Sequence, residues 1–176
     1  MALPVLTTER LPLRQRSIDD VPAIVRMNSD PEVMRFVGDG RMPDPSEIEK
    51  RTRERCGTDF GMGLGYWSVF PRERPDDYLG YVVLSPVPES TDIELSYGIR
   101  RDAWGEGFAT EGSRAALKFA FRQLGLPEIV ALTYPANLRS QRVIAKLGFV
   151  TAGIRHAYGQ DLLYFRLGRD AYLASP

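Results

Sequence analysis

A stretch in the middle of the chain, residues 92–123, joins three local patterns that together constrain the fold. A β-rich run from Ile93 to Ile99 ends in two arginines, a turn with Gly105 and Gly107 follows, and a helical pattern then extends to about Gln123. Glycine lets the backbone approach a ligand closely because it has no Cβ. The free N–H groups at the start of the helix point into the same space. This order of elements predicts an anion site, most often for phosphate.

Two well-known phosphate loops do not fit this turn. The dinucleotide fingerprint requires a third glycine three residues after Gly107, where the chain has Thr110. The nucleoside-triphosphate loop requires Gly-Lys-Ser/Thr, and the sequence contains no such triplet. An ordinary strand-to-helix connection also uses glycines, so this alternative stays open for the turn taken alone.

Residues 104–109, Trp-Gly-Glu-Gly-Phe-Ala, resemble the pyrophosphate loop of the GNAT acetyltransferases, whose pattern is Arg/Gln-x-x-Gly-x-Gly/Ala. With Trp104 at the first position and Thr110-Glu111 following, the stretch is similar to the branch that includes the Rim-type ribosomal-protein N-terminal acetyltransferases. A second block, Asn137 to Phe149, is similar to the family's Asn-x-x-Ser/Ala segment that ends in Gly-Phe. The two blocks in this order are far more specific than either alone.

The order of the expected elements predicts a mixed α/β class, because helices lie between the central strands and antiparallel strands lie on both flanks. The resemblance implies a GNAT fold, which is a twisted, mostly antiparallel sheet with splayed central strands flanked by helices. We expect residues 1–8 to be an irregular N-terminal lead-in and residues 9–173 to be a single domain. Residues 10–16 are expected to form an edge strand, because they include Pro12.

Charge and cysteine content exclude several classes of function. Lysine plus arginine and aspartate plus glutamate number 23 each, so no global positive field would attract nucleic acid or an anionic membrane. Cys56 is the only cysteine, which excludes a disulfide framework and a cysteine-rich metal site. No apolar run approaches the length of a membrane span. We therefore expect a cytoplasmic protein with no metal, nucleic-acid or membrane partner.

The resemblance implies acetyl-CoA as the donor and an amine-bearing acceptor, either a protein N-terminus or a small molecule. Glu94 stands at the glutamate of the Rim-type Glu-x-x-Tyr pattern, here Glu94-Leu95-Ser96-Tyr97. Burial in a cleft would raise the pKa of its carboxyl toward that of a useful base, acting through water. The alternative is a solvated residue on the polar face of the strand.

Protonation of the leaving thiolate is the second catalytic task. Many family members use a tyrosine seven residues after the asparagine, but that position is Ile144 here. The branch with serine at the equivalent of Ser140 gives the role to that hydroxyl, which is better suited to hydrogen bonding the sulfur. A first-turn serine satisfied by the helix backbone is the competing interpretation. Tyr97 and Tyr134 are second-choice donors.

Acetyl-CoA is expected to contact backbone more than side chains, with strand residues pairing with its pantetheine arm and loop N–H groups facing its pyrophosphate. Asn137 either only caps a helix or also reaches the pantetheine, and each nearby arginine is either a phosphate ligand or a surface charge. The expected cofactor-binding residues are Tyr97, Gly98, Ile99, Arg100, Arg101, Trp104, Gly105, Gly107, Phe108, Ala109, Thr110, Asn137, Arg139 and Arg142.

Other functions stay open on the residues alone. A non-catalytic CoA-binding or sensor module on the same fold is supported by Glu106 beside the phosphates and by the missing tyrosine at position 144. A different nucleotide-binding protein could use the same turn. His156 stands alone and is more typical of a structural role. The acceptor cannot be read from the sequence, and a homodimer is possible but not indicated by any pattern.

Overall fold

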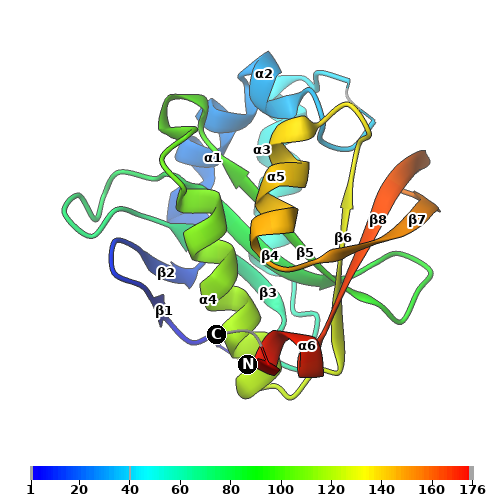
Figure 1. Cartoon of the computed structure of the whole chain (residues 1–176). Helices are drawn as coiled ribbons and strands as arrows, with labels where there is room; N and C mark the ends of the chain where they lie inside the picture. Colours follow the sequence, from blue (N-terminus) through cyan, green and yellow to red (C-terminus); the bar gives the residue numbers. More distant parts are fainter. Residues whose placement is uncertain (1, 40, 175–176) are drawn as a thin grey trace.

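One eight-stranded sheet runs through the part of the chain that the computed structural model describes, residues 2–39 and 41–174 (Figure 1). The strand order is β1-β2-β3-β4-β5-β6-β8-β7, and every neighbouring pair is antiparallel except β5 and β6, which are parallel. The predicted mixed α/β class is confirmed. The strands are Leu6–Thr7 (β1), Pro12–Gln15 (β2), Gly65–Val69 (β3), Gly80–Pro86 (β4), Ile93–Ile99 (β5), Glu128–Thr133 (β6), Val150–Ala157 (β7) and Gln160–Gly168 (β8).

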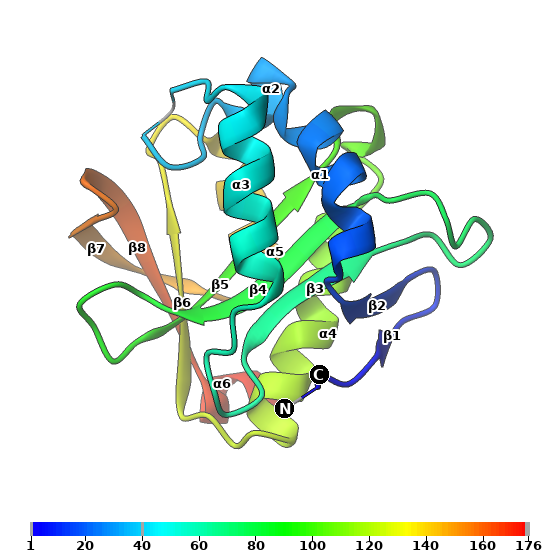
Figure 2. The same cartoon turned by 180° about the vertical axis from the view of Figure 1, so that it is seen from behind.

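Helices cover both faces of this sheet. In Figure 1 α4 and α5 lie in front of the central strands, and in Figure 2 α1 and α3 cover the opposite face. The main core lies under α4, where Trp67, Leu117 and Phe121 are fully buried. The helices are Val21–Asn28 (α1), Pro31–Met34 (α2), Pro45–Cys56 (α3), Phe108–Arg122 (α4), Leu138–Lys146 (α5) and Arg169–Ala174 (α6), with short 3-10 turns at Ile18–Asp20 and Arg101–Ala103.

The two central strands, β5 and β6, separate soon after they meet. Their register contains a single pair, Glu94 with Val130, and no later residue of β5 pairs with β6. Figure 1 shows the two strands diverging beyond this point. The splayed centre implied by the family resemblance is therefore confirmed. It leaves the edge of β5 that faces β6 without a strand partner from Ser96 to Ile99.

The N-terminal segment packs on the sheet, whereas the sequence predicted an irregular lead-in. Leu6 is buried and pairs with Leu13, so β1 lies outside β2 and the prediction of β2 as an edge strand is wrong. The indole nitrogen of Trp67 donates to the carbonyl of Pro4 at 2.9 Å. Burying Leu6 and satisfying this indole N–H stabilise the segment, and neither contact has a local sequence signal. In the described ranges, no helix is long and apolar enough to cross a membrane.

Candidate active site

The glycine turn before α4 adopts a backbone conformation that presents N–H groups. Gly105 and Gly107 have φ values of 88° and 82°, which a residue with a Cβ rarely adopts. The first helical hydrogen bond of α4 runs from the N–H of Glu111 to the carbonyl of Gly107 at 3.0 Å. The N–H groups of Phe108 to Thr110 precede that bond, and none of them donates to another residue in the described part of the chain. Free N–H groups at a helix N-terminus are suited to an anion.

Arg10, which precedes β2, holds this turn in place. Its Nη1 donates to the carbonyl of Glu106 at 3.0 Å and its Nε donates to Oε2 of Glu111 at 2.6 Å. Its guanidinium also lies 4.6 Å from the centre of the Phe108 ring. The carbonyl of Glu106 is therefore held by Arg10, whereas Glu106 as a whole is an exposed residue. Sequence reasoning missed Arg10, because 96 residues separate it from Glu106 and no local pattern connects them.

Trp104 connects the turn to both β5 and α5. Its indole nitrogen donates to the carbonyl of Ile99 at 2.7 Å, and the guanidinium of Arg139 lies 4.4 Å from the centre of its ring. Arg142 is exposed on the same helix, one turn further along. The structure therefore brings the turn, the end of β5 and Arg139 of α5 together.

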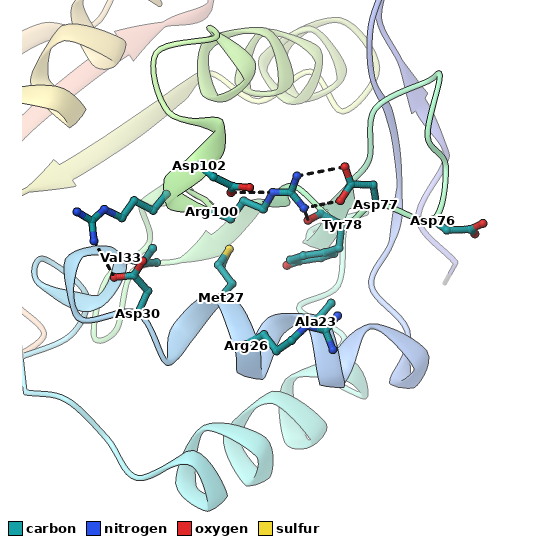
Figure 3. Close-up of a pocket in the computed structure, with 11 residues that line it drawn as sticks. Ala23, Arg26, Met27, Asp30, Val33, Asp76, Asp77, Tyr78, Arg100 and Asp102 are labelled. Carbon is teal, nitrogen blue, oxygen red and sulfur yellow. Dashed lines mark hydrogen bonds and ion pairs between the residues drawn. The ribbon is translucent and has the colours of Figure 1, made fainter.

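Arg100 and Arg101 are placed differently from the other predicted phosphate ligands. The guanidinium of Arg100 forms an ion pair with Asp77 and a second one with Asp102 at 2.9 Å (Figure 3). Arg101 is exposed and its guanidinium lies 4.0 Å from Asp30. Both arginines line a cavity of about 580 Å³ against α1. The Nη groups of Arg100 donate to Asp77 and to the carbonyl of Tyr78.

The open edge of β5 presents the backbone of alternate residues. The N–H of Arg100 donates to the carbonyl of Leu79 on the β4 side at 2.9 Å. Because backbone polar groups alternate along a strand, Gly98 also faces β4, while Tyr97 and Ile99 face the unpaired edge. The glycine at position 98 leaves room for the Tyr81 ring, because a Cβ there would lie 2.7 Å from that ring. An extended ligand could therefore pair with the backbone of Tyr97 and with the N–H of Ile99, whose carbonyl already accepts from the Trp104 indole.

Glu94 is buried at the point where β5 and β6 separate. Only 5% of the residue is exposed, so the solvated alternative does not hold. The hydroxyl of Tyr158 donates to Oε2 of Glu94 at 2.6 Å. Burial raises the pKa of Glu94 to about 7, and the hydrogen bond from Tyr158 opposes part of this rise. The carboxyl can therefore exchange a proton near neutral pH.

Tyr158 reaches Glu94 from the turn of the β7–β8 hairpin. Tyr158 and Gly159 have φ values of 55° and 72°, which is the backbone of a tight two-residue hairpin turn. Positive φ is unusual for an aromatic residue and is often associated with function. An ion pair between Arg155 and Asp92 ties the hairpin to the start of β5. Sequence reasoning missed Tyr158; the Tyr-Gly turn between two alternating runs could have located the hairpin, but not its contact with Glu94.

Ser140 and Tyr97 form a pair of hydroxyls on α5 and β5. Their oxygens lie 2.9 Å apart, and the Tyr97 hydroxyl also donates to the Ser140 carbonyl at 3.2 Å. Burial raises the pKa of Tyr97 to about 12. Ile144 is buried in the core, as its apolar side chain requires, and the hydroxyl of Tyr134 donates to the carbonyl of Gly38. Tyr97 is thus the tyrosine that the structure places beside Ser140.

Asn137 caps α5, as its sequence position predicted. Its Oδ1 accepts a hydrogen bond from the N–H of Ser140 at 3.2 Å. The Nδ2 group donates to no residue in the described ranges, so the cap uses only the oxygen of this side chain. His156 lies apart from these residues, on the exposed hairpin, where its Nδ1 is 2.8 Å from Asp161.

These parts define a class of protein before any comparison is made. The helix N-terminus suits a diphosphate, the unpaired edge of β5 suits an amide-bearing arm, and the arm would end between the hydroxyl pair and Glu94. That donor set fits coenzyme A. The class is an acyl-transferring enzyme that binds an acyl-CoA along a splayed strand.

The particular family follows from the comparison with known proteins. Residues 10–150 match the model of the acetyltransferase (GNAT) domain, so the chain belongs to the GNAT acetyltransferases. Members of this family are N-acetyltransferases that use acetyl-CoA. The family predicted from the two sequence blocks is confirmed.

Individual relatives agree with this result. The chain is 32% identical over 157 residues to an Aspergillus fumigatus protein named FsC-acetyl coenzyme A-N(2)-transacetylase, covering 84% of this chain but only 65% of that relative's length. An acetyltransferase from Agrobacterium tumefaciens has a TM-score of 0.81 at 24% identity, with 95% of each chain covered. Mycobacterium smegmatis RimJ, solved with CoA-disulfide, has a TM-score of 0.75 at 17% identity, covering 91% of this chain and 82% of its own. The two structures show a shared fold, which includes a Rim-type member.

Proposed function

We propose that this protein transfers an acetyl group from acetyl-CoA directly to a primary amine, carried by a protein N-terminus or a small molecule. The observation that carries the proposal is Glu94, a buried carboxyl with a pKa of about 7 where the central strands separate. A carboxyl in this position is the expected base for an attacking amine.

Acetyl-CoA supplies an activated thioester. The N–H groups of Phe108, Ala109 and Thr110 bind its diphosphate at the start of α4, with Gly105 and Gly107 shaping the approach. The backbone of Tyr97 and Ile99 binds the pantetheine arm, and the free Nδ2 of Asn137 donates to the same arm. Trp104 with Arg139 forms the outer wall, and Arg142 adds positive charge near the phosphates.

Glu94 keeps the amine reactive. Most alkyl amines are protonated near neutral pH and must lose a proton to attack a carbonyl. Because the pKa of Glu94 is about 7, half of its population is ionised near that pH and can accept the proton, directly or through one water. Tyr158 orients the carboxylate through its 2.6 Å hydrogen bond.

Tyr97 and Ser140 act at the other end of the reaction. When the single proton of Tyr97 turns from the Ser140 carbonyl to Ser140 Oγ, the serine proton is free to donate to the departing sulfur. Serine alone is too weak an acid to protonate the thiolate. Tyrosine is the more acidic of the two groups, so Tyr97 can replace the proton that Ser140 gives to the sulfur.

The test is release of free thiol from acetyl-CoA in the presence of a panel of amines, including peptide N-termini and alkyl amines. An amine-dependent release that is lost in Glu94→Gln supports the proposal. Calorimetric binding of CoA without thiol release for any amine would favour the non-catalytic module instead.

A further inference from the structure

Arg16 is a buried cation on the sheet face that α1 and α3 cover. It follows β2, and its N–H donates to the carbonyl of Tyr66 at 2.9 Å. Only 5% of the residue is exposed. Its guanidinium lies between two aromatic rings, 4.4 Å from the centre of Tyr66 and 5.1 Å from the centre of Tyr81. The rings stabilise the charge by cation–π contact but accept no strong hydrogen bond from it.

No carboxylate pairs with this guanidinium in the described part of the chain. The buried carboxylate of this region, Asp20, accepts instead from Arg14, from the Ser68 hydroxyl and from the N–H of Ser17. The Nε of Arg16 is buried without a hydrogen-bond partner in the ranges described. A buried charge with open donors is costly, and an anion would remove that cost.

Arg16 lines a cavity of about 320 Å³ at the end of α3. Arg55, Cys56 and Thr58 line this cavity together with Tyr66. Arg55 is exposed and forms no ion pair in the described ranges. One carboxylate, Asp59, also lines the cavity, and its Oδ1 accepts the N–H of Gly61 at 2.8 Å. Two arginines that line one cavity are suited to a carboxylate or a phosphate.

The cavity lies on the same face of the sheet as Glu94. Tyr66 pairs with Val83 and Val83 pairs with Ser96, two residues after Glu94 on the same side of β5. Arg55 and Tyr66 are also close enough to Tyr158 to act on its pKa, Tyr66 raising it and Arg55 lowering it, beside the larger effect of burial. The hydroxyl that contacts Glu94 therefore lies within electrostatic range of two residues that line the cavity.

We propose that this cavity binds a carboxylate or phosphate carried by the acceptor whose amine reaches Glu94, an inference that rests on the proposed function. Three strand spacings of about 4.8 Å place β2 roughly 14 Å from β5. The guanidinium of Arg16 also lies over Tyr66, which is two strand spacings from β5 and opposite Ser96, two residues from Glu94, so the gap to Glu94 is on the order of 12 Å. The acceptor is thus an extended amino acid with a distal acidic group, since the amine and acid of an α-amino acid lie too close together.

Titration calorimetry on the protein with CoA present tests this. The probes are ω-aminooctanoate, its neutral analogue ω-aminooctanamide and ω-aminooctyl phosphate. We expect an acidic probe to bind about tenfold more tightly than the amide, and Arg55→Ala to abolish most of this preference. Arg53→Ala is the matched control, because Arg53 lies on the far side of the same helix in an ion pair with Glu49. Equal binding of all three probes, or equal loss of preference in both variants, overturns the proposal.

Arg55 is the variant of choice because it is exposed, whereas replacing buried Arg16 could unfold the protein. Thiol release measured with the same probes separates this inference from the proposed function. An acid preference in binding without thiol release for any amine supports the anion site and contradicts the transfer reaction. Thiol release at equal rates with acid and amide, at equal affinity, supports the transfer reaction and overturns the anion site.

Discussion

The hydroxyl of Tyr158 lies 2.6 Å from Oε2 of Glu94 and joins a hairpin turn to a strand that begins far earlier in the chain. Two effects meet at this contact. Burial favours the neutral carboxyl, while a hydrogen bond from the tyrosine favours the charged one. Their balance leaves a pKa of about 7, which is where a base for an amine is useful.

Replacing the carboxyl tests the base directly. In Glu94→Gln we expect kcat to fall about a hundredfold or more, because the amide has the same shape but cannot accept the proton. The dissociation constant of CoA, measured by calorimetry, should stay unchanged because Glu94 lies away from the diphosphate turn. A variant with wild-type kcat would remove Glu94 from the mechanism.

The pH dependence of the reaction should follow the ionisation of Glu94. We expect kcat/KM to rise as pH increases through about 7 and then to level, because the base must be ionised. In Tyr158→Phe the hydrogen bond that lowers the pKa of Glu94 is lost, so the midpoint of the rise should move to higher pH. Rate measurements across the pH range check both statements. An unchanged or lower midpoint in Tyr158→Phe contradicts the role given to this tyrosine.

Stability should respond to pH through the same group. The pKa of Glu94 is about 7 in the folded protein, above its ordinary value of 4.5, so the folded state binds the proton more tightly. The resulting stabilisation is complete below pH 4.5 and is lost as pH rises through about 7. Relative to Glu94→Gln, the wild type should lose on the order of 3 kcal/mol over this window. Urea unfolding of both proteins at several pH values measures the difference, and parallel pH curves for the two proteins would contradict it.

The hydroxyl pair should behave as one unit. We expect Ser140→Ala and Tyr97→Phe each to lower kcat by about tenfold, and the double variant to cost little more than either. This non-additivity is expected because the two oxygens, 2.9 Å apart, form one hydrogen-bonded path to the sulfur. Thiol release at saturating acetyl-CoA is the measurement. Effects that multiply in the double variant would show two independent roles.

The glycine turn should be needed for CoA binding in addition to folding. Gly107→Ala places a Cβ at a φ of 82°, which costs roughly 1–2 kcal/mol and distorts the amides before α4. Gly125→Ala is a matched control, since Gly125 has a φ of 67° with open space around it after the end of α4. Both variants should lose stability, but only Gly107→Ala should bind CoA more weakly. Equal CoA affinity in the two variants would contradict the role of the turn.

Local patterns in the sequence were sufficient to predict the elements that build the candidate cofactor site. The glycines at 105 and 107 predicted the turn, because their backbone conformation is set by residue type. Asn137 predicted the start of α5, because a cap acts within one helical turn. The two family blocks implied the splayed sheet. The separate Glu-x-x-Tyr pattern singled out Glu94.

Contacts between distant segments were decided only by the tertiary structure. Strand register and packing, which residue type and spacing do not encode, decide three such contacts. Tyr158 donates to Glu94, Arg10 donates to the glycine turn, and the guanidinium of Arg16 lies among aromatic rings without an ion pair in the described residues. Arg100 shows the same limit, because its place after β5 suggested a phosphate ligand while folding set it beside Asp77. The sequence by itself determined which short segments could bind a diphosphate and which carboxyl could be the base. The folded sheet decided the pKa of that carboxyl and which other charges share its face, because pKa and ion pairing depend on burial and on neighbours brought together across the chain.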